Sequence, residues 1–474
     1  MPLFFDPGIS DEQYRAEQLA FVSDQSGSSY SLLMCGFLLS ACMNYTHHLL
    51  NVRFPWLHRS PVVHFLSDVC ITVPTIMVIM LCPPVVVPLC GLFIAFLAAL
   101  CWLTPQDTLP TSFPTVSTGF VEYRSVINLW TLVAILAVDF HVFPRFHTKS
   151  EFFGLSLMDV GVGAFVITSG IAAGFKPSTL SYVASLKAAV VQSFPLFALG
   201  LVRLLVTGAA HYQHHVSEYG VHLNFFFTLG LVQLLVALLH VPRRWAMAAS
   251  IAMMFVNELV LHGLGLYEYA RVAPRDTSFF AANREGLLSV VGYAALHMFF
   301  TTIGYWFSRS SEKAYRVRVD AFFAVLSAVL YVAYRLLNAV VPPCRSLLNA
   351  TYFAAVSSML LGSFALIDVL PMFLPLESTV GSNGLSLNQL PIFLLSNVMT
   401  GVVNLLFYTL YVPTVPSLVI IFVYTAINRA VAFVCGYFHV ASKIQARSVV
   451  RLSNDNRTTI QTYSLLTPLR RLFK

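Results

Sequence analysis

Long apolar runs separated by short polar segments are the feature that most constrains this chain. Of its 474 residues, 57% are hydrophobic and only 10% are charged, whereas a soluble protein carries about 25% charged residues. A chain of this length cannot hide so much apolar surface in one water-soluble core. The sequence therefore excludes an ordinary soluble enzyme, a disordered protein and a nucleic-acid-binding protein, and it indicates a polytopic membrane protein.

The apolar runs have the length that membrane-crossing helices require, which is about 20 residues. About 13 segments qualify, and they predict an all-α, polytopic bundle of transmembrane helices. They cover residues 30–45, 62–81, 83–103, 126–144, 153–174, 182–206, 223–240, 245–266, 287–306, 321–341, 347–370, 390–410 and 414–435. Because the segments between them are short, we expect a single transmembrane domain over residues 30–435.

The two ends of the chain differ in charge, and this difference predicts the orientation. Residues 1–29 are polar and acidic, unlike the basic start of a cleavable signal peptide. We expect them to form a luminal segment ahead of a signal-anchor helix. Residues 436–474 carry most of the formal net charge of +7, and we expect them to form a basic cytosolic tail. On this topology most Lys and Arg residues are cytosolic, as the positive-inside rule requires.

Four polar clusters fall on the predicted luminal face. They cover residues 139–159, 211–224, 274–286 and 344–352. The first contains Asp139, Lys149 and Asp159. A carboxylate in a membrane helix costs about 2.5–3.5 kcal/mol, so it needs a partner or a wet cavity. The convergence of the clusters predicts one polar cavity open to this face, with Lys149 as the nearest cation to Asp139.

Several of the polar residues also have a simpler structural interpretation. His211, His214, His215 and His222 have the composition of a metal site, but their spacing is a weak signal and we predict no metal. The string from Asn283 to Glu285 is also typical of a helix start. Asp139 and Lys149 are compatible with a structural ion pair. Hydrogen bonds that cross-link helices are the interpretation that we favour for Asn224, Asn397 and Asn404.

The clusters belong to longer strings that occur in a fixed order along most of the chain. These strings are Phe21-Val22-Ser23, Gly27-Ser28-Ser29, Tyr123-Arg124, Ala137-Val138-Asp139-Phe140, Phe143-Pro144-Arg145, Lys149, Gly154-Leu155-Ser156-Leu157-Met158-Asp159, Glu218-Tyr219-Gly220-Val221-His222, Asn224-Phe225-Phe226, Asn283-Arg284-Glu285-Gly286, Asn383-Gly384-Leu385, Asn397, Thr400-Gly401 and Asn404. Together they resemble the Gwt/PIG-W family, which acylates inositol during glycosylphosphatidylinositol (GPI) anchor synthesis.

The resemblance implies a multi-pass enzyme of the endoplasmic reticulum. It would transfer a fatty acyl group from acyl-CoA, its co-substrate, to an inositol hydroxyl of glucosaminyl-phosphatidylinositol, with no further cofactor. The family's catalytic pair is an Asp in the Ala-Val-Asp-Phe string and a Lys ten residues later, which here are Asp139 and Lys149. The chain departs from the family pattern at His141, usually Pro, and at Phe146, usually Arg. The expected substrate-binding residues are Arg145, Asp159, Glu218, His222, Asn224, Asn283, Arg284 and Glu285.

The resemblance leads to a mechanistic hypothesis. Partial desolvation should raise the pKa of Asp139 toward useful basicity, so that it serves as the general base on the inositol hydroxyl. Lys149 would stabilise the oxyanion or hold the thioester. Because no Ser or Cys nucleophile with a neighbouring base is evident, we favour direct transfer. His141 and His147 are rival bases on chemistry alone.

Two other classes of function are compatible with the composition. A lipid or solute transporter would use intramembrane charges such as Asp139, Asp159, Lys187, Arg203, Arg335 and Arg429 to line a path. The chain shows no two halves with matching motifs, which many transporters have. A non-catalytic scaffold would bind no acyl-CoA. In the favoured interpretation, acyl-CoA made in the cytosol must reach a luminal pair through the membrane domain.

Overall fold

The described part of the chain is helical. The computed structural model describes residues 4–23, 25, 27–58, 60–102, 118–176, 181–209, 217–310, 313–373, 377–438 and 440. Within these ranges the extended pairing consists of two isolated bridges, Phe4 with Phe407 and Gly27 with Leu155. The all-α class is confirmed. The predicted tail after residue 435 lies almost entirely outside the described residues.

Ten helices in the described residues are long and apolar enough to cross a membrane. They are α3 (Pro61–Leu81), α5 (Thr118–Ala137), α6 (Leu157–Gly174), α7 (Tyr182–Ala209), α9 (Arg243–Gly263), α12 (Arg284–Ser308), α13 (Lys313–Asn338), α14 (Ala350–Phe373), α16 (Gln389–Leu406) and α17 (Thr414–Tyr437). Three other predicted segments coincide with α2 (Tyr30–Arg53), α4 (Pro83–Trp102) and α8 (Phe225–Leu239). The apolar parts of α4 and α8 are shorter than 18 residues, and α2 carries many Ser, Thr, Asn and His side chains. The count of 13 and the orientation stay predictions.

Short helices complete the fold and lie mainly in the connections. They are α1 (Asp11–Val22), η1 (Pro55–His58), η3 (Arg145–His147), α10 (Leu266–Val272), α11 (Phe279–Ala282), α15 (Val380–Leu387) and η4 (Thr409–Tyr411). Side-chain caps start several of them. Ser10 accepts from the Gln13 amide at the start of α1, and Thr379 accepts from the Ser382 amide at the start of α15. Such caps satisfy amides that lack a partner within the helix.

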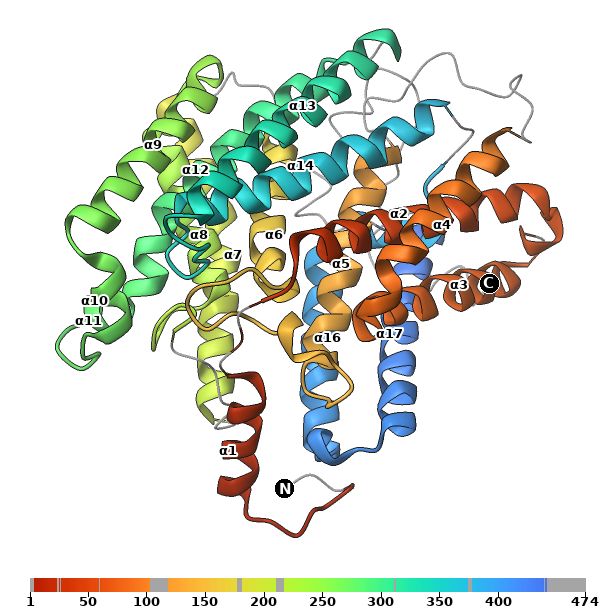
Figure 1. The fold of residues 1–474 in the computed structure, drawn as a ribbon, viewed down its shortest axis with the longest axis horizontal. Helices are drawn as coiled ribbons and strands as arrows, with labels where there is room; N and C mark the ends of the chain where they lie inside the picture. The colour runs from red at the N-terminus through yellow and green to blue at the C-terminus, as the bar shows by residue number, and fades with distance from the viewer. Residues whose placement is uncertain are drawn as a thin grey trace.

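The helices pack in layers around a buried centre. Figure 1 shows α13 and α14 running side by side, while α5, α16 and α17 stand upright beside them. Most of α5, α12 and α14 is buried, whereas α7 and α13 face outward. The backbones of α6 and α12 approach closely because Gly174 and Gly304 lack side chains at the contact; a Cβ on Gly304 would lie 2.1 Å from the Ile171 carbonyl oxygen.

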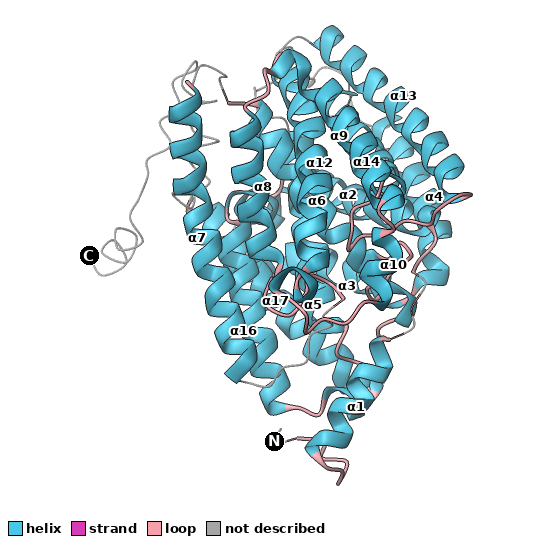
Figure 2. Ribbon diagram, turned by 90° about the vertical axis from the view of Figure 1, so that its left-hand side faces the viewer, coloured by secondary structure: helices cyan, strands magenta, loops and turns pink. Residues whose placement is uncertain are grey.

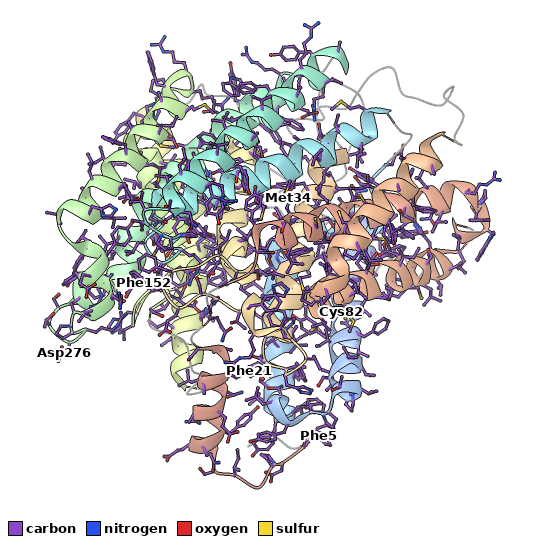
Figure 3. All side chains as sticks on the ribbon, in the orientation of Figure 1. Phe5, Phe21, Met34, Cys82, Phe152 and Asp276 are labelled. Atoms are coloured by element: carbon purple, nitrogen blue, oxygen red, sulfur yellow. The ribbon has the colours of Figure 1, made fainter. Side chains whose placement is uncertain are left out.

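The outer faces of the helices carry large apolar side chains, as the hydrocarbon core of a membrane requires. Phe194 of α7, Phe255 of α9 and Leu336 of α13 are all exposed. The side chains project outward around the helical bundle (Figure 3). These exposed faces belong to three of the helices that are long and apolar enough to cross a membrane.

Several connections meet at one end of the bundle, which we call the site face. It comprises residues 4–29, 138–156, 217–224, 264–283, 339–349 and 407–413, in so far as they are described. Direct contacts join them: Gly154 donates to the Pro343 carbonyl at 2.8 Å, and Phe4 donates to the Leu406 carbonyl at 2.9 Å. The helix α1 lies at this end (Figure 2). These are the connections that the sequence assigns to the lumen.

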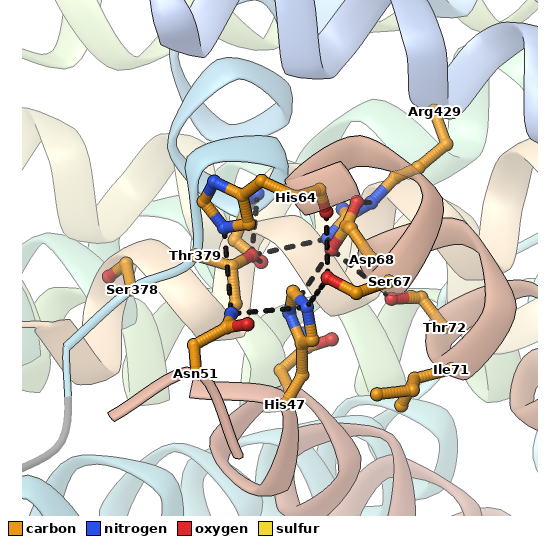
Figure 4. A network of polar contacts seen from close by, with 12 residues as sticks. His47, Asn51, His64, Ser67, Asp68, Ile71, Thr72, Ser378, Thr379 and Arg429 are labelled. Atoms are coloured by element: carbon orange, nitrogen blue, oxygen red, sulfur yellow. Dashed lines mark hydrogen bonds and ion pairs between the residues drawn. The ribbon is translucent and has the colours of Figure 1, made fainter. Parts of the chain in front are cut away.

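A buried ion pair ties the other end of the bundle together. Asp68 of α3 accepts two hydrogen bonds from Arg429 of α17, at 2.6 Å from Nε and 2.8 Å from Nη2. His47 of α2 lies 3.5 Å from the same carboxylate, and Thr379 accepts from Arg429 at 3.2 Å. Figure 4 shows the network. The bidentate geometry offsets the desolvation of both charges, and the network joins α2, α3 and α17 to the start of α15.

We predict that Asp68→Ala lowers stability by about 3–5 kcal/mol, because it removes the carboxylate that is hydrogen-bonded to the buried Arg429. The measurement is thermal unfolding of the purified protein in detergent. The double variant Asp68→Leu with Arg429→Met should recover much of the loss, because it removes both charges. Asp276→Ala, at an exposed carboxylate, is the matched control. Equal unfolding temperatures for Asp68→Ala and the control would contradict this assignment.

Candidate active site

The loop from α5 to α6 carries both predicted catalytic residues. The helix α5 ends at Ala137, and Asp139 lies two residues later, in the turn that follows the helix. The Asn404 amide of α16 donates to Oδ2 of Asp139 at 2.7 Å. Burial raises the pKa of Asp139 to about 6, although the hydrogen bond from Asn404 opposes this shift. The direction agrees with the expectation for a general base.

Lys149 is paired with a carboxylate from another loop. Its Nζ lies 2.7 Å from both carboxylate oxygens of Glu218. Burial lowers the pKa of Lys149, and Glu218 opposes this change. For Glu218, burial acts to raise the pKa, but Lys149 and Arg345 outweigh it and lower the pKa to about 2. Among the described residues the ion-pair partner of Lys149 is therefore Glu218, and not Asp139.

Asp159 is held by the protein on both oxygens. It lies in the first turn of α6, where it forms a capping box with Ser156. Its Oδ2 accepts from the amides of Ser150 and Ser156 at 3.0 Å, and its Oδ1 accepts from Nε of Arg345 at 2.8 Å. These bonds fix the loop that carries Lys149. The role of Asp159 as a substrate ligand stays a prediction.

Arg345 is a site residue that the sequence analysis did not select. It is buried, and its guanidinium lies over the ring of Tyr219, 5.7 Å from the centroid. It thus contacts both Asp159 and the residue next to Glu218. The available signal was its position within the polar stretch before α14. Through Arg345 the clusters around Lys149, Glu218 and α14 become one network.

The loop that carries Glu218 is fixed on the start of α12. Oδ1 of Asn283 accepts from the amides of His222 at 2.7 Å and Leu223 at 3.2 Å. Gly220 has a φ of 100°, and a Cβ there would lie 2.4 Å from the Asn283 Cα, so only glycine fits. Asn283 is the N-cap residue of α12, but its side chain makes no capping bond. Its side chain instead holds the loop.

Arg284 and Glu285 stabilise the loop between α9 and α12. Arg284 is buried and donates to the carbonyls of Ala270 at 3.1 Å and Ala273 at 2.8 Å. Glu285 accepts from both Nη atoms of Arg275, at 3.0 and 2.6 Å. Among the described residues, these contacts do not bring the two side chains to Asp139 or Lys149. Their predicted roles as substrate ligands stay predictions.

The remaining predicted residues also have protein partners. Arg145 donates to the carbonyl of Phe21 at 3.0 Å. Asn224 caps α8 through the Phe226 amide and donates to the Gly200 carbonyl at 2.9 Å, as a helix cross-link should. Asn397 instead donates to a carbonyl of its own helix. Of the four histidines considered for a metal, His222 alone lies within the described residues, in which no cluster suited to a metal occurs.

The two rival bases have different surroundings. Nδ1 of His147 lies 2.7 Å from the Ser28 hydroxyl, and burial lowers the pKa of His147 to about 4. His141 is exposed and lies 3.2 Å from the Thr414 hydroxyl. Neither forms a hydrogen bond with Asp139 or Lys149 among the described residues. The choice of Asp139 over these two histidines as the base stays a prediction.

A cavity of about 790 Å³ runs beside α8, and its position differs from the expected polar opening on the site face. It is mainly apolar and lies among α5, α6, α7, α8, α12 and α16. Its lining extends along α8 from Phe225, next to the Glu218 loop, to His240 at the opposite end. Lys176 and Arg243 line that opposite end. The site-face clusters converge on each other through ion pairs and hydrogen bonds, whereas the cavity lies beside α8.

Fold and site together define a multi-pass helical membrane protein with a buried network of charges at one end and a long apolar cavity. The sequence model of the GWT1 family matches residues 14–435. The phosphatidylinositol-glycan biosynthesis class W protein of Dictyostelium discoideum is 30% identical over 495 aligned positions, which cover 91% of this chain and 99% of that protein. GPI-anchored wall transfer protein 1 of Schizosaccharomyces pombe is 36% identical and covers 68% of this chain and 73% of its own length. The chain belongs to the GWT1 family.

We predict that Glu218→Gln lowers the pKa of Lys149, because the carboxylate that opposes the effect of burial is removed. The measurement is the pH dependence of Lys149 modification by an amine-reactive ester, followed by mass spectrometry. The titration midpoint should shift to lower pH in Glu218→Gln. Glu151→Gln, which changes an exposed carboxylate two residues from Lys149, should leave it in place. An unchanged midpoint in Glu218→Gln would argue against the pairing.

Proposed function

We propose that this chain is an inositol acyltransferase of GPI-anchor biosynthesis in the endoplasmic reticulum membrane. It transfers a fatty acyl group from acyl-CoA to an inositol hydroxyl of glucosaminyl-phosphatidylinositol. The observation that carries the proposal is a single loop that holds a part-buried carboxylate, Asp139, and a part-buried ammonium, Lys149. The names of the relatives, which refer to GPI anchors, support the same process.

Asp139 supplies the base in this reaction. With a pKa of about 6 it is mostly ionised at neutral pH, yet it is more basic than an ordinary carboxylate. It takes the proton of the inositol hydroxyl while the hydroxyl oxygen attacks the thioester carbonyl. The carbon–sulfur bond then breaks, the CoA thiolate takes the proton back from Asp139 and leaves as the thiol, and the ester remains on inositol. No acyl-enzyme is needed.

Lys149 supplies positive charge where the oxyanion develops. Glu218 and the Asp159–Arg345 pair hold its loop in place before substrate arrives. Such preorganised charge is worth most in a site that excludes water. The Lys149 side chain is more exposed than that of Glu218, 32% against 17%, which supports access of the reacting carbonyl to Lys149.

The cavity beside α8 suits the acyl chain. A helix of 15 residues is about 22 Å long, so the cavity extends over much of the thickness of a membrane. Lys176 and Arg243 near its far end are suitable partners for phosphate groups. The other end reaches Phe225, next to the loop that carries Glu218. This arrangement supports a route for acyl-CoA from the predicted cytosolic face to the catalytic loop.

The transporter alternative finds less support. Arg429 and Asp159, which were candidates for lining a path, are both in buried ion pairs with Asp68 and Arg345. Paired charges that hold helices together do not line an open route. The acyltransferase proposal accounts for the same charges and also for the apolar cavity.

We predict that Asp139→Asn and Lys149→Ala each reduce turnover by about 100-fold or more, because a general base and an oxyanion partner each contribute on this scale. The assay uses purified protein, labelled acyl-CoA and glucosaminyl-phosphatidylinositol. Asp276→Asn, at an exposed carboxylate, is the control and should keep normal turnover. Near-normal turnover in both variants would refute the assignment, and loss only in His141→Ala would place the base elsewhere.

The pH dependence follows from the pKa of Asp139, which is raised to about 6. The reactive form is the carboxylate, so activity is present above this pKa and is lost as the pH falls through it. Below about pH 6, kcat/KM should drop about tenfold per pH unit. The measurement is kcat/KM from pH 4.5 to 8. A constant kcat/KM down to pH 4.5 would contradict the role of Asp139 as the base.

A further inference from the structure

The N-terminal segment covers the loop that carries Asp139. Tyr14 of α1 is buried, with 7% of its surface exposed. The segment is attached at three places: Phe4 forms a bridge to Phe407, Gly27 forms a bridge to Leu155, and the Phe21 carbonyl accepts from Arg145. A segment with such attachments is suited to hold a side chain of the site in one orientation.

A chain of hydrogen bonds leads from this segment to Asp139. The Tyr14 hydroxyl lies 3.2 Å from Oγ1 of Thr409. Thr409 donates to Oδ1 of Asn404 at 3.4 Å, and Nδ2 of Asn404 donates to Oδ2 of Asp139 at 2.7 Å. Because Thr409 uses its only proton toward Asn404, Tyr14 must be the donor to Thr409. Every group in this chain of hydrogen bonds then has a defined role as donor or acceptor.

We propose that Tyr14, Thr409 and Asn404 are positioning residues that keep Asp139 as an ionised base for the proposed acyl transfer. An Asn side chain has a donor end and an acceptor end, which can exchange by a rotation. With its acceptor end engaged by Thr409, Asn404 presents its donor end to Asp139. This end stabilises a carboxylate, whereas the acceptor end would stabilise the protonated acid. The hydrogen-bond chain therefore selects the form that can accept a proton.

Among the described residues, the side-chain hydrogen bond that acts on the pKa of Asp139 comes from Asn404. Two titratable groups interact electrostatically with the Asp139 carboxylate, Tyr14 of α1 and Tyr424 of α17. His141, on the same loop, is directed to Thr414. Among the described residues, burial and the Asn404 bond are the causes of its altered pKa. Loss of the bond should therefore raise that pKa further.

The test measures the titration of Asp139 directly in the full-length protein in detergent. A carbodiimide with an added amine labels the protonated carboxyl, and mass spectrometry follows Asp139 from pH 4.5 to 8. Asn404→Ala should shift the labelling midpoint upward by about one pH unit. Thr409→Val and Tyr14→Phe should shift it upward by less, and Thr409→Ser should restore it. The acid limb of the kcat/KM profile should move by the same amount in each variant.

Two matched variants control for general loosening of the fold. Asn397→Ala removes an amide on α16 that donates to its own helix, to the Phe393 carbonyl. Tyr411→Phe removes a hydroxyl that joins η4, the element that also contains Thr409, to Glu17 of α1. Both should leave the midpoint unchanged. If Asn404→Ala leaves it unchanged, or if the control variants shift it equally, the positioning role is overturned.

The two proposals can fail separately. If the wild-type protein transfers no acyl group, the proposed function fails, and the labelling midpoint still decides the relation between Asn404 and Asp139. If the wild-type protein is active and the midpoint does not respond to Asn404→Ala, the function stands and the positioning role falls.

Discussion

The buried ion pair between Asp159 and Arg345 is the interaction on which the rest of the site depends. Its carboxylate also caps α6 and holds the amide of Ser150, next to Lys149. Its guanidinium reaches the Tyr219 ring beside Glu218. One pair thus connects the starts of α6 and α14 with the loop before α8. A buried pair is maintained only when its geometry is good, so it fixes these connections relative to each other.

This rigid frame separates the two proposed functional groups. Lys149 belongs to the charged network and has Glu218 as its partner, whereas Asp139 accepts a hydrogen bond from the Asn404 amide of α16. The separation matters for the proposed chemistry. A direct ion pair would lower the basicity of Asp139, but burial without a counter-charge raises it. The same loop therefore provides a base and a cation that do not neutralise each other.

Much of this arrangement could be predicted from the sequence, and the missing parts share a physical cause. Each of the 13 apolar segments predicted from the sequence overlaps a helix of the structure. The resemblance pointed to the loop that carries Asp139 and Lys149. The sequence could not show that Glu218 is the partner of Lys149, because the two residues are 69 positions apart and meet only in the folded structure. Arg345 and Asn404 were missed as site residues for the same reason. The lengths of the helices limited the span count, since α8 has only 15 residues.

The most direct test of the proposed mechanism is the identity of the acylated product. The purified protein is mixed with acyl-CoA, with and without glucosaminyl-phosphatidylinositol, and both lipid and protein are analysed by mass spectrometry. Direct transfer predicts one acyl group on the inositol ring when the acceptor is present and no acyl group on the protein when it is absent. An acylated protein, or an acceptor that remains unmodified, would contradict the mechanism.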